Sequence, residues 1–194
     1  MKKPVFIILS FMTVLFAREL SIGKVMPKVN IPIPDVNGET FTLKKLMDKN
    51  GLLVIFSCNT CPWVIHWQDR YNPIAGLCSE NNIGFVAVNS NARQHNGVDS
   101  YKAMQEHARE YNYKFPYVMD KRAELANAFG AKKTPHVYLF NKDNKLVYRG
   151  AIDDNAENAD NVTTSYLVNA VNAVAMGEEI KVKKTKALGC SIKF

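Results

Sequence analysis

Continuous apolar runs alternate with segments of helical spacing along this chain. The runs LLVIFS (residues 52–57) and IGFVAVNS (83–90) are rich in β-branched side chains and are typical of strands buried inside a sheet. HVYLF and KLVYRG flank a polar turn at 141–144 and predict a hairpin, and PIPDVNGETFTL (32–43) predicts a smaller one around Asn-Gly. A short strand is also expected in FPYVMD, at 115–120.

Helical spacing begins at Pro62, where apolar positions recur through Tyr71, and Pro73 is expected to bend this helix before it continues to residue 77. A helix at 124–130 should end at Gly130, in the usual position of a closing glycine. Further helices are predicted over residues 43–50, 99–113 and 163–176.

This order of elements predicts an α/β fold, with a central mixed β-sheet flanked by helices on both faces. It is the order of a thioredoxin-like fold with an extra helix near the middle and an N-terminal β-hairpin extension. With 194 residues, of which 47% are apolar, the chain can bury one sizeable core. We expect one domain over residues 24–180, followed by a basic C-terminal tail over 181–194.

The first 17 residues do not fit this domain. Lys2 and Lys3 precede an apolar run that ends at Ala17, and its length suits a secretory signal peptide but not a membrane span. Leu15 is large for a position where cleavage sites usually have a small residue, so an uncleaved N-terminal anchor remains an alternative. The sequence therefore predicts an exported, periplasmic protein without a stable membrane span.

The net charge of +7 falls to +5 when Lys2 and Lys3 are removed with the signal, and part of the excess lies in KVKKTK, residues 181–186. A solvated surface segment explains that run, although it could also contact acidic partners. Aromatic residues do not interleave with basic ones in a stripe, so no nucleic-acid partner is expected.

Four cysteines are too few and too unevenly spaced to form a disulfide framework for such a domain. Cys58 and Cys61 form a CxxC pair, which favours redox chemistry or metal binding. Pro62 belongs at the first helical position, so Cys61 should be the N-cap. There the free amides and the helix dipole would lower its thiol pKa. We expect Cys61 to be the nucleophile and Cys58 to resolve it; the alternative is a structural, buried or bridged pair.

A Thr-Pro step, Thr134–Pro135, opens the strand that begins at residue 136. From these residues alone, a cis bond and an ordinary trans bond are equally compatible with a strand-opening proline. In a thioredoxin-like sheet this turn would face the cysteine loop, and the main chain of Thr134 would pair with an extended substrate.

Taken in order, FSCNTCPWV, NSNARQ, FPYVMD, KTPHVYLF, KLVYRGAIDD and GCSIKF resemble the peroxiredoxin-like branch of the thioredoxin superfamily, also described as redoxin or alkyl hydroperoxide reductase/thiol-specific antioxidant proteins. The resemblance covers residues 24–194. It implies a thioredoxin-like fold, a cis-proline at Pro135 and redox activity at Cys58 and Cys61. The peroxiredoxin pattern P-x-x-x-T-x-x-C is broken, because Val54 replaces its proline and Cys58 its threonine.

Other residues near the pair are compatible with more than one role. Trp63, and also Trp67, could form an apolar rim for substrate or simply pack, and His66 is expected at the surface. Cys78 is expected to be an inert core residue. Cys190 could be a possible resolving thiol if the tail folds back across the site, or it could bridge two molecules.

Three functions from different classes follow. The first is an exported thiol–disulfide oxidoreductase that needs no cofactor, acts on a disulfide-bearing protein or small disulfide, and takes electrons from a thiol protein. The second is a peroxidase in which Cys61 reduces hydroperoxides and Cys58 or Cys190 resolves the sulfenic acid. The third is a copper or zinc carrier using Cys58, Cys61 and His66 or His136; no second close Cys or His pair supports it.

Overall fold

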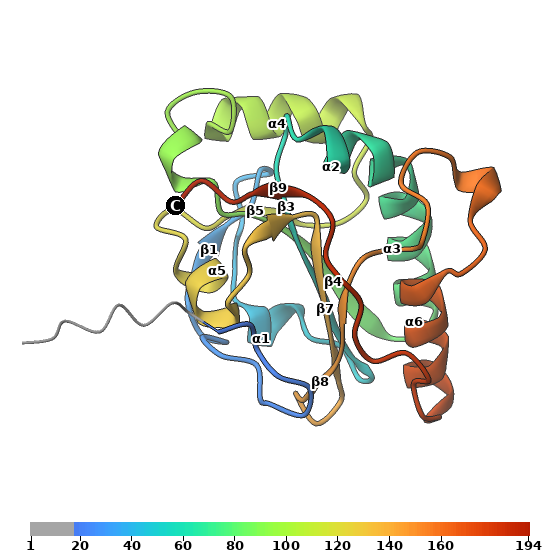
Figure 1. Cartoon of the computed structure of the whole chain (residues 1–194). Coiled ribbons are helices and arrows are strands. Elements are labelled where there is room, and N and C mark those ends of the chain that lie inside the picture. Colours follow the sequence, from blue (N-terminus) through green and yellow to red (C-terminus); the bar gives the residue numbers. More distant parts are fainter. Residues whose placement is uncertain (1–17) are drawn as a thin grey trace, which may run out of the picture.

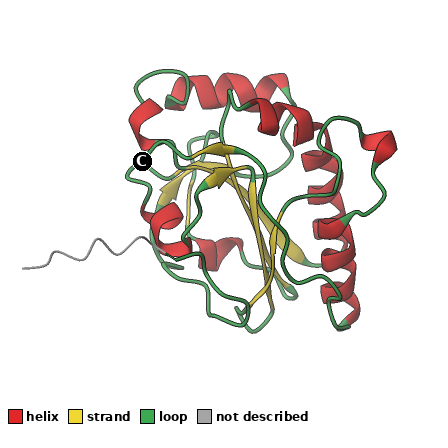
Figure 2. Cartoon of the chain, viewed as in Figure 1, coloured by secondary structure: helices red, strands yellow, loops and turns green. Residues whose placement is uncertain are grey.

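A twisted five-stranded sheet forms the centre of the computed structural model, which describes residues 18–194 (Figures 1 and 2). The strand order is β5-β4-β3-β7-β8, in which β3, β4 and β5 run parallel, β7 pairs antiparallel with β3, and β8 pairs antiparallel with β7. The five strands are β3 (Gly51–Ser57), β4 (Ile83–Asn89), β5 (Tyr117–Met119), β7 (His136–Asn141) and β8 (Leu146–Gly150). The predicted mixed sheet and the predicted hairpin of β7 and β8 are confirmed.

Strand β3 lies in the middle of this sheet, and all seven of its residues are buried. Its side chains alternate between two cores, with Leu53 and Ile55 on one face and Leu52, Val54 and Phe56 on the other. A strand covered on both faces must be apolar throughout, which explains the continuous run in the sequence.

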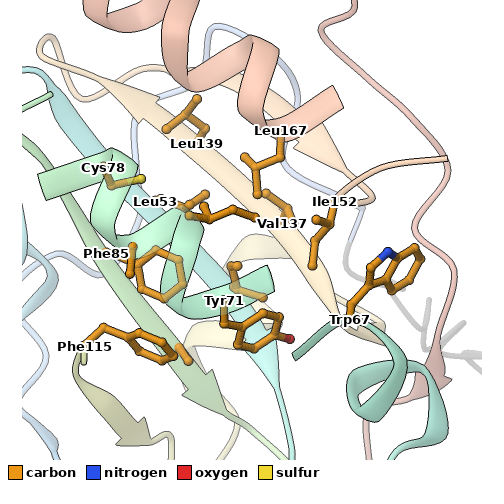
Figure 3. Packing of buried hydrophobic residues seen from close by; sticks show 14 of the residues in the cluster. Leu53, Trp67, Tyr71, Cys78, Phe85, Phe115, Val137, Leu139, Ile152 and Leu167 are labelled. Carbon is orange, nitrogen blue, oxygen red and sulfur yellow. The ribbon is translucent and has the colours of Figure 1, made fainter. Parts of the chain in front are cut away.

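Helices cover both faces. The face of Leu53 packs against α2 (Pro62–Trp67), α3 (Tyr71–Glu80), α4 (Tyr101–Glu110) and α6 (Tyr166–Met176), and Figure 3 shows the packing of this core. The opposite face packs against α1 (Leu43–Leu46) and α5 (Glu124–Phe129). Gly130 closes α5 in the left-handed conformation, with φ 64°, as its sequence position predicts. The remaining elements are β1 (Ile33–Pro34), β2 (Thr40–Phe41), β6 (Lys133–Thr134), β9 (Cys190–Ser191) and the 3-10 turns η1 (Gln68–Arg70), η2 (Ala92–Gln94) and η3 (Ala159–Asn161).

Some predicted boundaries were wrong. The helix expected over 43–50 stops at Leu46, because the backbone amide of Asp48 donates to the carbonyl of Gly51 in a tight turn. The bend expected at Pro73 lies one turn earlier, at η1. A proline ring clashes with the carbonyl four residues before it, here that of Asp69, so Pro73 itself fits in the first turn of α3.

The C-terminal tail folds back over the sheet, as a resolving role for Cys190 requires, although its basic run was expected to be a solvated surface segment. After α6 it follows the outer edge of β8, where the Arg149 amide donates to Lys183 O and the Thr185 amide donates to Arg149 O. It then crosses the end of the sheet as β9, which pairs antiparallel with β6 (Figure 1, dark red). The lysine side chains of the tail stay exposed, while its backbone is fixed to the domain.

The small hairpin of β1 and β2, with Asn37 and Gly38 in its turn, is present as predicted. Within residues 18–194, no helix is both long enough and apolar enough to cross a bilayer. The predicted signal peptide or anchor, residues 1–17, lies outside the described residues.

Candidate active site

The end of β3 carries Cys58 and Cys61 in the loop that leads into α2. Cys61 is the N-cap of α2, with Pro62 at the first helical position, as the sequence predicts. Pro62 has no N–H to satisfy, and its fixed φ starts the helix at this point. Both thiols are free rather than bridged.

Thr134, from β6, contacts both thiols. Cys61 Sγ lies 3.1 Å from the Thr134 carbonyl oxygen, to which its thiol donates while it is protonated, and Cys58 Sγ shares a hydrogen bond with Thr134 Oγ1 at 3.3 Å. The bond between Thr134 and Pro135 is cis, which confirms that prediction. The loop of β6 and β7 and the cysteine loop therefore meet face to face.

A third thiol completes the cluster. In the pairing of β6 with β9, Cys190 lies opposite Thr134 and Ser191 opposite Lys133. The Cys190 thiol and backbone amide lie close enough to the Cys61 sulfur to lower the pKa of Cys61, and the Trp63 amide likewise acts to lower the pKa of Cys190. The tail thus brings Cys190, from the far end of the chain, to the nucleophile.

These contacts separate the pKa values of the three thiols. The pKa of Cys61 lies well below that of an ordinary cysteine, chiefly because the Cys58 thiol donates a hydrogen bond to its thiolate. Cys190 donors and the Val64 amide lower it further, against the effect of burial. The same hydrogen bond to Cys61, together with burial, raises the pKa of Cys58. Burial and the neighbouring Cys61 raise the pKa of Cys190 to about 11.

The ionised sulfur is nevertheless covered. Cys61 is only 4% exposed and Cys58 only 2%, and Thr134 beneath β9 is 1% exposed. The sequence suggested an accessible thiolate with an open edge at Thr134 for a substrate strand. In the structure β9 occupies that edge.

A buried carboxylate behind the loop was missed by the sequence analysis. Asp99, fully buried, accepts from the Asn59 backbone amide at 2.9 Å and from the side-chain amides of Asn89 and Asn91 at 2.8 Å each. Asn91 Oδ1 in turn accepts from the Lys193 amide at 2.9 Å. One carboxylate therefore ties together the cysteine loop and the tail. The signal was the polar NSN that directly follows a buried strand, since polar residues at the carboxyl ends of parallel strands meet at one edge of a sheet.

The two tryptophans of α2 differ. Trp63 is 37% exposed beside the thiols, whereas Trp67 is fully buried and donates from Nε1 to Asp153 Oδ1 at 2.8 Å, so only Trp63 can form a rim. Cys78 is buried in the core, and burial raises its pKa to about 12, as expected of an inert thiol.

The histidines do not join the thiols. His66 is exposed on α2. His136 stacks on Tyr138, in the core on the opposite face of the sheet from Cys58 and Cys61. Between residues 18 and 194, no group of three or more His, Cys, Asp or Glu side chains is arranged to hold a metal ion.

Comparisons with known proteins agree with the fold of the chain. The Redoxin family model matches residues 21–165. A solved structure of an uncharacterized conserved protein from Geobacillus kaustophilus is 34% identical, with a TM-score of 0.82 over 90% of this chain and 92% of that one. A solved thioredoxin-like protein in the oxidized form, 22% identical with a TM-score of 0.64 over 82% of this chain and 100% of that one, confirms the predicted thioredoxin-like fold.

Among curated proteins, the thiol-disulfide oxidoreductase ResA of Halalkalibacterium halodurans is 26% identical over 61% of this chain. The match spans 63% of that relative's length. The family match covers most of the chain and confirms the resemblance drawn from the motifs around Cys61 and Pro135. The chain belongs to the redoxin family.

Proposed function

We propose that this redoxin is an exported thiol–disulfide oxidoreductase in which Cys61 is the nucleophile and Cys58 the resolving thiol. The observation that carries the proposal is the opposite shift of two neighbouring thiols, a lowered pKa at Cys61 and a raised one at Cys58, both held on Thr134. The name of the ResA relative supports the reaction class. The apolar segment before residue 18 supports export.

The reaction takes place in two exchanges. The Cys61 thiolate attacks one sulfur of a substrate disulfide, which forms a mixed disulfide and releases the other substrate sulfur as a thiolate. Cys58 then loses its proton and attacks the sulfur of Cys61, which forms the Cys58–Cys61 disulfide and releases the second substrate thiol. The substrate gains two electrons, and a donor thiol protein returns two electrons to the enzyme.

The first exchange also activates the second. The largest cause that raises the pKa of Cys58 is its hydrogen bond to the Cys61 sulfur, and the charge of Cys61 adds to it. A mixed disulfide on Cys61 carries no charge and accepts hydrogen bonds weakly. The pKa of Cys58 therefore falls once Cys61 has reacted, and its thiolate forms when it is needed.

Substrate recognition is assigned to three residues around Cys61. Trp63 offers an exposed apolar face beside the nucleophile, and Thr134 with Pro135 forms the edge along which an extended chain would pair. A polypeptide substrate requires β9 to leave that edge.

Peroxide reduction fits the site less well. Cleavage of the O–O bond needs donors preorganised around the peroxide oxygens, and loss of one such donor costs about 3 kcal/mol, or roughly a hundredfold in rate. Cys58 stands where peroxiredoxins have the threonine hydroxyl. Its thiol is already engaged, because it shares a hydrogen bond with Thr134 and lowers the pKa of Cys61 as a donor to that thiolate.

Stopped-flow oxidation of the reduced protein tests the proposal, with a small disulfide in one run and hydrogen peroxide in another. We expect rapid exchange with the disulfide and a peroxide rate close to that of an ordinary low-pKa thiol. Cys61→Ser should abolish the exchange, while Cys78→Ser, a matched buried cysteine outside the site, should preserve it. A peroxide rate orders of magnitude above that of a free thiol, with slow disulfide exchange, would establish the peroxidase instead.

A further inference from the structure

We propose that Cys190 is a third redox-active thiol of the site, which β9 delivers to Cys61 so that the two close an intramolecular disulfide. The proposal rests on the thiol–disulfide exchange proposed above. For a small disulfide that leaves β9 in place, it adds a second route for resolving the mixed disulfide on Cys61.

The position of Cys190 is that of a substrate cysteine. It lies opposite Thr134 in the pairing of β6 with β9, on the edge where an extended substrate was expected to pair. The Thr134 carbonyl is also the acceptor for Cys61. Because the pairing sets Cys190 opposite the residue that contacts both active-site thiols, the chain presents its own cysteine to its own nucleophile.

The tail is fixed immediately after Cys190. Ile192 is 5% exposed in the core of the α5 face, and its amide donates to Lys132 O at 3.0 Å. Lys193 bonds through its amide to Asn91 Oδ1 and through its carbonyl to the Arg93 amide, at 2.9 and 3.0 Å. These contacts hold the thiol at the site and give it a high effective concentration at Cys61.

The residue before Cys190 permits the close approach. A Cβ atom on Gly189 would lie 2.3 Å from the carbonyl oxygen of Thr134, which is far inside contact distance. Only glycine therefore lets the tail lie this close to β6. Gly189 therefore permits the close approach to Thr134, and Cys190 supplies the thiol.

Cys190 resolves the mixed disulfide on Cys61 by thiol–disulfide exchange. With Cys61 held in a mixed disulfide to a substrate sulfur, the Cys190 thiol loses its proton and attacks the sulfur of Cys61. The Cys61–Cys190 disulfide forms, the bond to the substrate breaks, and the substrate leaves as a thiolate that takes a proton. The oxidant is the substrate disulfide.

The resting state of Cys190 agrees with this order of events. Burial raises its pKa first, followed by its hydrogen bond to Cys61 and the negative charge of Cys61, so it rests as a protonated donor. Once Cys61 is in a mixed disulfide, neither its hydrogen bond nor its charge raises the pKa of Cys190 any longer. The positive charge of Lys193, which lowers that pKa, remains. The alternative of a bridge between two molecules would require the Cys190 sulfur to leave Cys61.

Disulfide mapping tests the proposal directly. Reduced wild-type, Cys58→Ser and Cys58→Ser/Cys190→Ser proteins are mixed with glutathione disulfide, quenched, and mapped by peptide mass spectrometry. We expect Cys58→Ser to form Cys61–Cys190 and release glutathione, and the double variant to retain glutathione on Cys61. If Cys58→Ser keeps glutathione on Cys61, or forms dimers bridged through Cys190, the resolving role of Cys190 is refuted. The proposed function would still stand in either case. If Cys61 takes no glutathione in any variant, the proposed function fails as well, and this inference falls with it.

A glycine pair tests the positioning by β9. In the Cys58→Ser background, Gly189→Ala should slow closure of Cys61–Cys190 by about tenfold or more, because the alanine Cβ pushes the tail away from Thr134. The formation of the Cys61–glutathione adduct should not slow. In the Gly76→Ala variant, where the added Cβ meets nothing within 4 Å, the Cys61–Cys190 disulfide should form at the same rate as in the Cys58→Ser parent. Equal closure rates in the two alanine variants would refute the role of β9.

Discussion

The hydrogen bond from the Cys58 thiol is the largest contribution that lowers the pKa of Cys61, ahead of the Cys190 thiol and the Val64 amide. The sequence suggested a different cause, the free amides and dipole of the helix that Cys61 caps. Both causes favour the thiolate, but α2 has only six residues, and the neighbouring thiol donates directly to the charge. The nucleophile therefore depends on its own resolving partner.

Replacing Cys58 should make this dependence visible. Cys58→Ala removes the donor and should raise the pKa of Cys61 by about one to two units, since a hydrogen bond to a charged group contributes about 1.5–3 kcal/mol. Cys58→Ser keeps a donor and should raise the pKa less. Because the thiolate is the reactive form, a higher pKa moves the loss of alkylation rate to higher pH. Alkylation of the Cys61 peptide, followed against pH, measures the shift; identical profiles for the alanine and serine variants would contradict it.

Helix α2 shows how one short element serves both the site and the core. Trp63 faces outward beside the thiols, and four residues later Trp67 is buried and donates to Asp153, which is also paired with Arg70 at 3.2 Å. That buried contact fixes the orientation of the helix whose first turn holds Cys61.

Conservative changes at the two tryptophans should separate these roles. Trp67→Phe should lower the free energy of unfolding by about 2–3 kcal/mol, because it leaves the buried Asp153 without one donor and leaves space unfilled. Trp63→Phe should change it by less than about 0.5 kcal/mol. Urea denaturation followed by circular dichroism compares them, and a similar loss in both variants would show that Trp67 is not the anchor.

The hydrogen bonds of Asp99 connect separate segments of the fold. Its carboxylate joins the cysteine loop, the end of β4 and, through Asn91, the tail. A buried charge of this kind is stable only when every nearby donor is used.

Asp99→Ala should therefore destabilise the fold by about 3 kcal/mol, since three buried donors lose the carboxylate and only Asn89 keeps another acceptor, the Tyr117 hydroxyl. Glu106→Ala, on the exposed side of α4, is the matched control and should cost less than about 0.5 kcal/mol. Thermal and urea unfolding of both variants provide the measurement. Equal stabilities would mean that water replaces the carboxylate at little cost.

At the scale of the whole molecule, the sequence predicted the elements and helix ends that depend on a local residue pattern. The apolar runs identified β3 and β4, Pro62 placed Cys61 at a helix start, and Gly130 ended α5. Two-residue β9 has no such pattern, because its position depends on pairing with β6 and on the anchoring of Ile192 in a distant core. Asp99 likewise has the sequence pattern of an ordinary polar residue near a helix start, because the donors around it come from two other segments, the cysteine loop and the end of β4. Contacts between distant segments account for both omissions.

Removing the last six residues, Gly189–Phe194, should open the site. Cys61 is 4% exposed with β9 in place, so its alkylation at neutral pH should rise by about tenfold or more in the shortened protein. Cys190→Ser keeps the strand and should leave the rate within a few-fold of wild type. Peptide mass spectrometry reports the labelling of Cys61, and circular dichroism verifies the fold. An unchanged rate after truncation would mean that β9 does not limit access.

The anchoring of Lys193 has a practical consequence for handling the protein. Its amide and carbonyl are both hydrogen-bonded, to Asn91 and Arg93, directly before Phe194. An affinity tag or fluorescent fusion attached after Phe194 would begin close to Lys193, whose hydrogen bonds hold the strand that covers the thiols. Arg18, by contrast, lies against Gly130 on the α5 side of the sheet. Recombinant protein for kinetic work should therefore carry its tag ahead of Arg18, because a label after Phe194 would alter the reactivity being measured.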